Sequence, residues 1–328
     1  MTTLNTSRIR RWRWLIVALV IAATACASVY FLRPAWLLEG YFAAQRWHAG
    51  MQLASVDVAG APWRYVEGGS GETVLLVHGM AGSKENWMLM APYLRDEFHL
   101  VAPDQAGFGD SADALDDDYR VSAQVERLRE FADALQLQRF HLVGHSMGGQ
   151  IAGIFAARYP DRVRSLSLMS SAGVPFKANA FQALIARGEN PFATESVEKF
   201  DVFMRMTFTH PPFAPPRLRQ AYAERNVRRA ALWNRILRRI SGEKSRYYLQ
   251  QKLADIHAPT LVLWCDGDQL LDVSSTEAFR AGLPSADIEI LQGCGHMPMM
   301  EQPRQTADLL RHLFVANKDA SVAGSAKK

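Results

Sequence analysis

The sequence predicts an α/β protein with a mostly parallel sheet that is covered by helices on both faces. Short apolar runs with the length of buried strands alternate with longer runs whose apolar residues recur at helical spacing. Such alternation builds a parallel sheet between two layers of helices. A Gly-x-Ser-x-Gly sequence at residues 144–148 connects one of these strands to one of these helices. A chain of 328 residues with 48% hydrophobic content can form a full core, which excludes a disordered protein.

The N-terminal region is predicted to cross a membrane once. A basic segment, 1–13, precedes an uncharged apolar segment, 14–32, whose length of about nineteen residues suffices for a transmembrane helix. Four arginines precede this segment and only Arg33 follows closely, so the positive-inside rule places the N-terminus in the cytoplasm. In a bacterium this predicts a single-pass protein of the inner membrane with its folded part in the periplasm. The alternative is a signal peptide that is cleaved near Ala25.

Residues 33–52 mix aromatic side chains, including Trp36, Phe42 and Trp47, with polar ones. This composition fits an amphipathic juxtamembrane helix that lies on the membrane surface. It fits equally well a helix that packs on the folded part, and the sequence leaves both open.

The strands of the sheet are expected where apolar runs are bounded by turn residues. A leading hairpin turns at Gly60, and a helix containing Trp87 and Met90 is expected after the first fully apolar strand. A further helix is predicted over residues 121–135, from its apolar spacing. The predicted strands cover residues 56–58, 63–66, 74–77, 99–102, 140–143, 163–169, 259–264 and 288–291.

Residues 175–256 interrupt the alternation, because they contain no convincing strand. We expect them to form a helical cap over the edge of the sheet at which Ser146 lies. The core of the fold then consists of residues 53–174 and 257–316, and residues 317–328 form a polar tail. The arginines of the cap form either an ordinary solvated helix face or a site for lipid phosphates.

Ser146 is the candidate nucleophile. A tight turn between strand and helix forces the serine into a strained backbone conformation, and Gly144 and Gly148 leave room for the neighbouring chain. The turn exposes Ser146 Oγ above the N-terminus of the following helix, where the amide of Met147 can donate to a developing oxyanion. A Gly/Ser turn without chemical role is the alternative, since this motif also arises by chance.

Two aspartates and a histidine follow the last predicted strands. Asp266 and Asp268 come after the strand at 259–264, and the offset from the strand end favours Asp268 as the partner of a histidine. His296 lies in a glycine-containing turn rather than on an apolar face, which argues against a packing role. Ser146, Asp268 and His296 can therefore act as nucleophile, orienting acid and general base.

Cys265 and Cys294 follow the last two predicted strands, which should be neighbours in a parallel sheet. In an oxidising compartment the two thiols can pair and connect the loops of Asp268 and His296. Buried cysteines are otherwise simple packing residues, and the sequence leaves both open.

The charge pattern gives no reason to expect a nucleic-acid partner. The net charge of +4 is small, and the basic clusters carry no nucleic-acid-binding motif. No spacing of His, Cys, Asp or Glu matches a metal site, and the predicted chemistry needs no organic cofactor.

Together these motifs resemble the α/β-hydrolase fold, which implies an eight-stranded, mostly parallel sheet. A more detailed resemblance is to the membrane-anchored monoacylglycerol lipases of the alpha/beta-hydrolase-domain group and their bacterial lipase relatives. It covers residues 56–314 and the N-terminal anchor. Cys265 departs from the family, because many members have glycine there. The stretches that carry the resemblance are residues 84–87, 141–150, 243–247, 268–274, 294–296 and 300–304.

The resemblance implies hydrolysis of carboxylic esters of lipids through an acyl-serine intermediate. The candidate triad has the chain order that these hydrolases use. The turn after strand 74–77 is where such enzymes hold a second oxyanion donor, which implies the amide of Met80 beside Gly79. The substrate is then a membrane lipid, namely a monoacylglycerol, a lysophospholipid or a glycerophospholipid.

Some aromatic residues of the cap are then expected to line an acyl pocket, among them Phe181 and Phe203, together with Met297 of the core. Two other functions stay open, a tethered hydrolase of small soluble esters or carbon–carbon bonds and a non-catalytic lipid-binding protein. The sequence also leaves open a homodimer supported by the anchor.

Overall fold

A central sheet organises the computed structural model, which describes residues 6–194 and 196–317. Its eight strands within these residues follow the order β1-β2-β4-β3-β5-β6-β7-β8. The pairs β1/β2 and β2/β4 are antiparallel and all other neighbours are parallel, which confirms the predicted fold class. The strands are β1 (Gln52–Val58), β2 (Ala61–Gly68), β3 (Glu72–Val77), β4 (Phe98–Pro103), β5 (Phe140–His145), β6 (Val163–Met169), β7 (Thr260–Cys265) and β8 (Asp287–Leu291).

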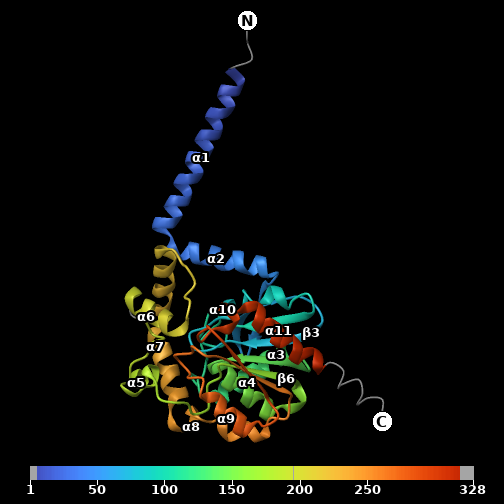
Figure 1. Cartoon of the computed structure of the whole chain (residues 1–328). Coiled ribbons are helices and arrows are strands. Elements are labelled where there is room, and N and C mark those ends of the chain that lie inside the picture. Colours follow the sequence, from blue (N-terminus) through green and yellow to red (C-terminus); the bar gives the residue numbers. More distant parts are fainter. Residues whose placement is uncertain (1–5, 195, 318–328) are drawn as a thin grey trace.

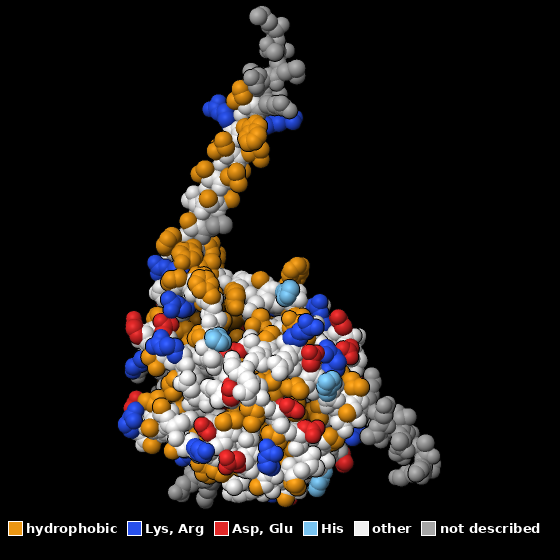
Figure 2. Space-filling model, viewed as in Figure 1, with side chains coloured by type: hydrophobic (Ala, Val, Ile, Leu, Met, Phe, Trp, Pro, Cys, Tyr) orange, Lys and Arg blue, Asp and Glu red, His pale blue; other side chains and the backbone are white. Residues whose placement is uncertain are grey.

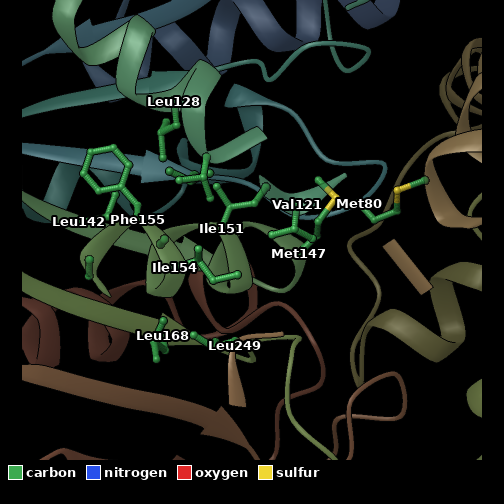
Figure 3. Close-up of a cluster of buried hydrophobic side chains, with 14 of the residues drawn as sticks. Met80, Val121, Leu128, Leu142, Met147, Ile151, Ile154, Phe155, Leu168 and Leu249 are labelled. Carbon is green, nitrogen blue, oxygen red and sulfur yellow. The ribbon is translucent and has the colours of Figure 1, made fainter. Parts of the chain in front are cut away.

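Helices cover both faces of this sheet (Figure 1). In β3 the side chains alternate between two buried clusters, with Leu75 in one and Leu76 in the other, as expected for a strand that is buried on both sides. The first cluster includes Leu128 and Ile151 and is drawn in part in Figure 3. Its helices are α3 (Val121–Ala134), α4 (Met147–Arg158) and α9 (Ser275–Gly282), and the opposite face carries α10 (Pro298–Glu301) and α11 (Pro303–Ala316).

The prediction of one helix around Trp87 and Met90 is wrong about the type of helix. The structure has two short 3₁₀ helices there, η1 (Lys84–Trp87) and η2 (Ala91–Tyr93), although both predicted apolar side chains are fully buried. The amide of Lys84 donates to Asp104 at 2.7 Å, so a tertiary contact holds the first turn. Pro92 lacks an amide hydrogen and restricts the residue before it, which disfavours a continuous α-helix.

The segment predicted to form a cap is helical and contains no strand among its described residues. Its elements α5, α6 and α7 stand beside the sheet (Figure 1). They are α5 (Ala180–Ala186), α6 (Val197–Thr207), α7 (Pro216–Ser241), α8 (Glu243–Arg246) and η4 (Gln250–Asp255).

Helix α1 (Thr6–Leu32) projects away from the folded body (Figure 1). Its portion Ile9–Leu32 is long and apolar enough to cross a membrane, and the most apolar window of that portion buries none of its residues inside the protein. Figure 2 shows this apolar surface between basic residues at the far end of α1 and the body. The helix begins before the predicted span and so includes part of the basic segment.

Helix α2 (Pro34–Ala49) packs on the folded part through one face only. Leu38 and Phe42 form a small buried cluster with Ala221 of α7. Trp36 and Trp47 remain 63% and 82% exposed. Of the two alternatives for this segment, packing on the domain therefore describes the buried face, while the aromatic face is free to contact a membrane surface.

Acid is expected to destabilise the fold through His141 of β5. Its ring is fully buried, with Nδ1 2.8 Å from Ser165 Oγ, and burial lowers its pKa to about 4. The unfolded chain binds this proton near pH 6.5. Stability should therefore be lost as the pH falls from about 6.5 to about 4, by at most about 3 kcal/mol. Denaturant unfolding at several pH values should show a weaker acid dependence for His141→Gln, and an unchanged dependence would contradict this assignment.

Candidate active site

Ser146 lies in the predicted turn between β5 and α4. Its backbone has φ 55° and ψ −121°, a conformation that costs energy for any residue with a side chain. Four hydrogen bonds hold it there. The amide of Ser146 donates to the Met169 carbonyl at 3.0 Å, and its own carbonyl accepts from Gly149 at 2.9 Å, from Gln150 at 3.2 Å and from Ala172 at 3.0 Å.

Close packing around the turn explains its glycines. A Cβ atom on Gly144 would lie 2.3 Å from the Gly148 carbonyl oxygen, and one on Gly148 would lie 2.2 Å from that of Val77. A Cβ on Gly79 would lie 2.7 Å from Ser146 Cβ. Real carbon atoms do not approach this closely, so only glycine fits these positions without moving the backbone.

His296 and Asp268 are in direct contact and almost completely buried. His296 Nδ1 lies 2.7 Å from Asp268 Oδ2. The other carboxylate oxygen, Oδ1, accepts from the amides of Leu270 at 3.0 Å and Leu271 at 2.9 Å. Asp266 instead accepts from the Gly293 amide at 2.8 Å. The structure thus brings Asp268, rather than Asp266, to the histidine, and this contact orients the imidazole.

Met80 and Met147, whose amides are the candidate oxyanion donors, line the smaller cavity together with Ser146. The side chains of Met80 and Met147 lie at the same end of the first buried cluster (Figure 3). Within residues 6–194 and 196–317 neither backbone amide donates to a protein acceptor. Met147 begins α4, where the helix dipole adds positive potential. Both amides are therefore available to an oxygen of a substrate.

Cys265 and Cys294 form a disulfide, with their Cα atoms 5.3 Å apart. Cys265 ends β7 and precedes the loop of Asp268, and Cys294 precedes His296 by two residues. Of the two alternatives for these cysteines, the structure has the paired one. The bond ties together the two loops that carry the His–Asp contact.

The model of the alpha/beta hydrolase fold matches residues 72–303. The chain belongs to the alpha/beta hydrolase family. It is 30% identical over 305 residues to the monoacylglycerol lipase ABHD6 of Homo sapiens, covering 89% of this chain and 90% of that protein. It is 34% identical over 242 residues to Lipase 3 of Moraxella sp. (strain TA144), covering 73% of this chain and 76% of that lipase. The crystal structure of a bacterial membrane phospholipase A superposes with a TM-score of 0.84 at 36% identity, covering 93% of this chain and 99% of that one.

These findings confirm the resemblance inferred from the sequence. Two of these three similar proteins are lipases by name and the third is a phospholipase, so this alpha/beta hydrolase is a carboxylic ester hydrolase.

Two cavities of this alpha/beta hydrolase meet at Ser146. The larger has a volume of about 500 Å³, and its lining includes Phe203 and Met297, two of the residues expected to line an acyl pocket. The smaller has a volume of about 100 Å³ and is lined by Phe181. Ser146 and His296 line both cavities, so each predicted pocket residue lies beside the candidate site.

Three residues that sequence reasoning missed support the histidine loop. Glu301 accepts from the amide of Gly295 at 2.7 Å and also from two amides of the cap, those of Thr209 and His210, each at 3.0 Å. The amide of His296 donates to the carbonyl of Thr207 at 2.7 Å. These contacts tie the loop to the end of α6.

His145, beside the nucleophile, is the third of these contributors. Its Nε2 lies 2.7 Å from the His296 carbonyl oxygen, and burial lowers the pKa of His145 well below its ordinary value. Because a carbonyl oxygen only accepts, Nε2 must carry the hydrogen of a neutral ring. No pattern in the sequence marks this pair, since the two residues are 151 positions apart.

Lys84, at the start of η1, is a fully buried cation. Its Nζ lies 2.7 Å from Asp104 Oδ2, 2.6 Å from Asp110 Oδ2 and 3.5 Å from Glu85 Oε1. Burial alone would lower the pKa of Lys84, but Asp104 and Asp110 outweigh it and hold that pKa above the ordinary value. Lys84 follows Met80 by four residues, so the cluster anchors the chain where it leaves the turn of Met80.

Two arginines reach this cluster from outside the sheet. Arg46 of α2 pairs with Glu85 at 2.5 Å, and Arg225 of α7 pairs with Asp110 at 2.9 Å. The sequence suggests either a solvated helix face or a lipid-phosphate site for the cap arginines. Several of them instead form ion pairs with aspartates of the loop between β4 and α3. The further pairs are Arg229 with Asp113 and Arg235 with Asp117.

Replacing Lys84 with methionine is expected to destabilise the fold by about 3–5 kcal/mol, because it leaves the carboxylate of Asp104 buried without its cation. The midpoint of chemical unfolding should fall accordingly. Lys252→Met is the matched control, because Lys252 pairs with Asp255 on the surface and its loss should change stability little. Equal midpoints for the two variants would contradict the structural role of Lys84.

Proposed function

We propose that this alpha/beta hydrolase is a membrane-anchored serine lipase that cleaves carboxylic ester bonds of membrane lipids. The observation that carries the proposal is the larger cavity. It combines Ser146 and His296 with an apolar lining from the cap and from α2, the helix next to the candidate membrane span. Phe213 also lines it and is 93% exposed, so the cavity wall continues into an apolar surface that a bilayer could cover.

In the proposed mechanism His296 removes the proton of Ser146 Oγ as that oxygen attacks the ester carbonyl. Asp268 holds the imidazole in the tautomer with a free Nε2 and stabilises its charged form. The amides of Met80 and Met147 bind the oxyanion, and each is expected to lower the barrier by on the order of 3 kcal/mol. His296 then protonates the leaving alcohol, and water attacks the acyl-serine to release the fatty acid.

The proposed location is the bacterial inner membrane, with the catalytic part in the periplasm. The arginines before the apolar part of α1 support a cytoplasmic N-terminus. The disulfide between Cys265 and Cys294 supports an oxidising compartment for the folded part. A homodimer through the anchor stays a prediction.

The test is hydrolysis by the full chain in detergent, with monoacylglycerol, lysophospholipid and diacyl phospholipid offered separately and the released fatty acid quantified. We expect release from at least one lipid, and we expect a serine-directed fluorophosphonate to abolish it. Hydrolysis of short soluble esters without any lipid would instead favour the tethered soluble-substrate hydrolase. Failure of the fluorophosphonate to label the protein would favour a non-catalytic lipid-binding protein.

A further inference from the structure

The smaller cavity differs from the larger one in its charged lining residues, although both reach Ser146. Its far wall is formed by α5, by the end of α7 and by α8, which lies at the end of the body away from α1 (Figure 1). Phenylalanine and methionine side chains recur around the larger cavity, but its wall also carries charged residues of both signs, namely Glu85, Asp201, Arg205 and Arg219. The smaller cavity has polar groups in its apolar wall but no carboxylate among its described lining residues. These polar groups are Gln150, Gln182, Ser241, Arg246 and Tyr247.

An ester has an acyl part and an alcohol part, which leave the reacting carbon on different sides. Of the two, the larger cavity, with about 500 Å³ against about 100 Å³, is the one with room for a fatty acyl chain. The alcohol part of a lipid is polar and in a phospholipid carries an anionic phosphate. The smaller cavity offers polar groups without a carboxylate among its described lining residues, whereas Glu85 and Asp201 stand in the wall of the larger one. The two cavities thus match the two parts of a lipid ester.

Apart from His296, Arg246 is the one ionisable basic or acidic residue among the described lining residues of the smaller cavity. Its guanidinium lies 5.3 Å from the ring centre of Tyr247, and no described acidic side chain pairs with it. This sets it apart from cap arginines such as Arg225 and Arg229, whose charges are paired with aspartates.

The backbone at Arg246 is held relative to the nucleophile, and its exposed side chain extends from there. Gln150, on the first turn of α4 after Ser146, donates through Nε2 to the carbonyl of Ser245 at 2.7 Å. The amide of Arg246 donates to the carbonyl of Gly242 at 2.9 Å. One side-chain hydrogen bond therefore links the helix that carries the nucleophile to the residue before Arg246.

We propose that Arg246 binds the phosphate of the alcohol part, so that the smaller cavity is a subsite for phosphate-bearing glycerol. A guanidinium forms charge-assisted, often bidentate, hydrogen bonds with phosphate. The enzyme then favours lipids whose glycerol carries a phosphate over monoacylglycerol with the same acyl chain. This inference rests on the proposed lipase activity and assigns the specificity of that same site.

The test compares oleoyl lysophosphatidylglycerol with monooleoylglycerol in identical detergent micelles, using the full chain. Arg246→Gln should raise KM for the lysophospholipid by about 10- to 100-fold, the loss expected for a charge-assisted contact, with kcat changed little. KM for monooleoylglycerol should stay within about twofold, because that substrate has no anion to bind. Arg246→Lys should retain part of the preference, since lysine keeps the charge but not the planar fork.

Arg239→Gln is the matched control, because Arg239 is an exposed arginine near the end of α7 that lines neither cavity. Glycerol 3-phosphate should also inhibit monooleoylglycerol hydrolysis competitively in the wild type and much less in Arg246→Gln. If Arg246→Gln loses the same activity on both lipids, Arg246 has a merely structural role. If Arg246→Gln and Arg239→Gln raise KM for the lysophospholipid equally, the effect is one of general surface charge. Either result overturns the subsite. Wild-type protein that cleaves neither lipid would instead overturn the lipase proposal, and the subsite with it.

Discussion

Replacing Ser146 with alanine is expected to lower kcat on every lipid ester by about 10⁵- to 10⁶-fold, because the attacking oxygen is lost. The residual rate comes from substrate binding and from the amides of Met80 and Met147, which the substitution leaves in place. Alanine has the same backbone constraints as serine at φ 55°, and the four hydrogen bonds of this residue involve only its backbone. The fold should therefore be retained.

The measurement is single-turnover and steady-state release of fatty acid, together with thermal unfolding of both proteins. Ser167→Ala in β6 is the matched control, since Ser167 Oγ is buried without a hydrogen-bond partner among the described residues. Its loss should leave activity within about twofold, because an unpaired hydroxyl contributes little. A Ser146→Ala protein that keeps most of its activity while folded normally would refute the nucleophile assignment.

Local geometry made the nucleophile turn predictable from the sequence. Strand, turn and helix are contiguous there, and each of the glycines at 144 and 148 has a steric reason that depends on the neighbouring chain. The alternation of strands and helices made the class of the sheet predictable in the same way, because burial on both faces leaves uninterrupted apolar runs such as residues 74–77 of β3.

Long-range polar contacts were not predictable in this way. Lysine is normally a surface residue, so nothing in the sequence suggests that Lys84 is buried. Its partners Asp104 and Asp110 lie twenty or more positions away, and only the fold brings them to it. Glu301 binds the amide of Thr209 across 92 positions. Charge pairing of this kind leaves no periodic signal in one sequence, so the supports of the site appear only in the structure.

The cap shows the same limit. Its helical nature follows from the absence of strand patterns, but the partners of its arginines do not. Arg225 and Arg229 recur at the spacing of a helix face, which is the pattern of a solvated surface. The structure places aspartates of the core loop opposite them.

Replacing Asp268 with asparagine is expected to lower kcat by about 10⁴-fold with little change in structure. Oδ1 of Asp268 is held by two backbone amides, those of Leu270 and Leu271, which only an acceptor can satisfy. An asparagine must therefore keep its carbonyl oxygen there and direct its NH₂ group at Nδ1 of His296. The imidazole would then carry its hydrogen on Nε2, the atom that has to accept the proton of Ser146.

Asp266→Asn separates this effect from a general loss of charge near the histidine loop. Asp266 accepts one amide, that of Gly293, through Oδ1, and an asparagine oxygen can replace it there. We expect activity within about threefold of the wild type, because this side chain has no contact with His296 among its described hydrogen bonds. Equal losses in the two variants would mean that negative charge, rather than the tautomer of His296, limits the reaction. A selective loss in Asp268→Asn would instead trace the rate to the hydrogen bond at 2.7 Å between His296 and Asp268.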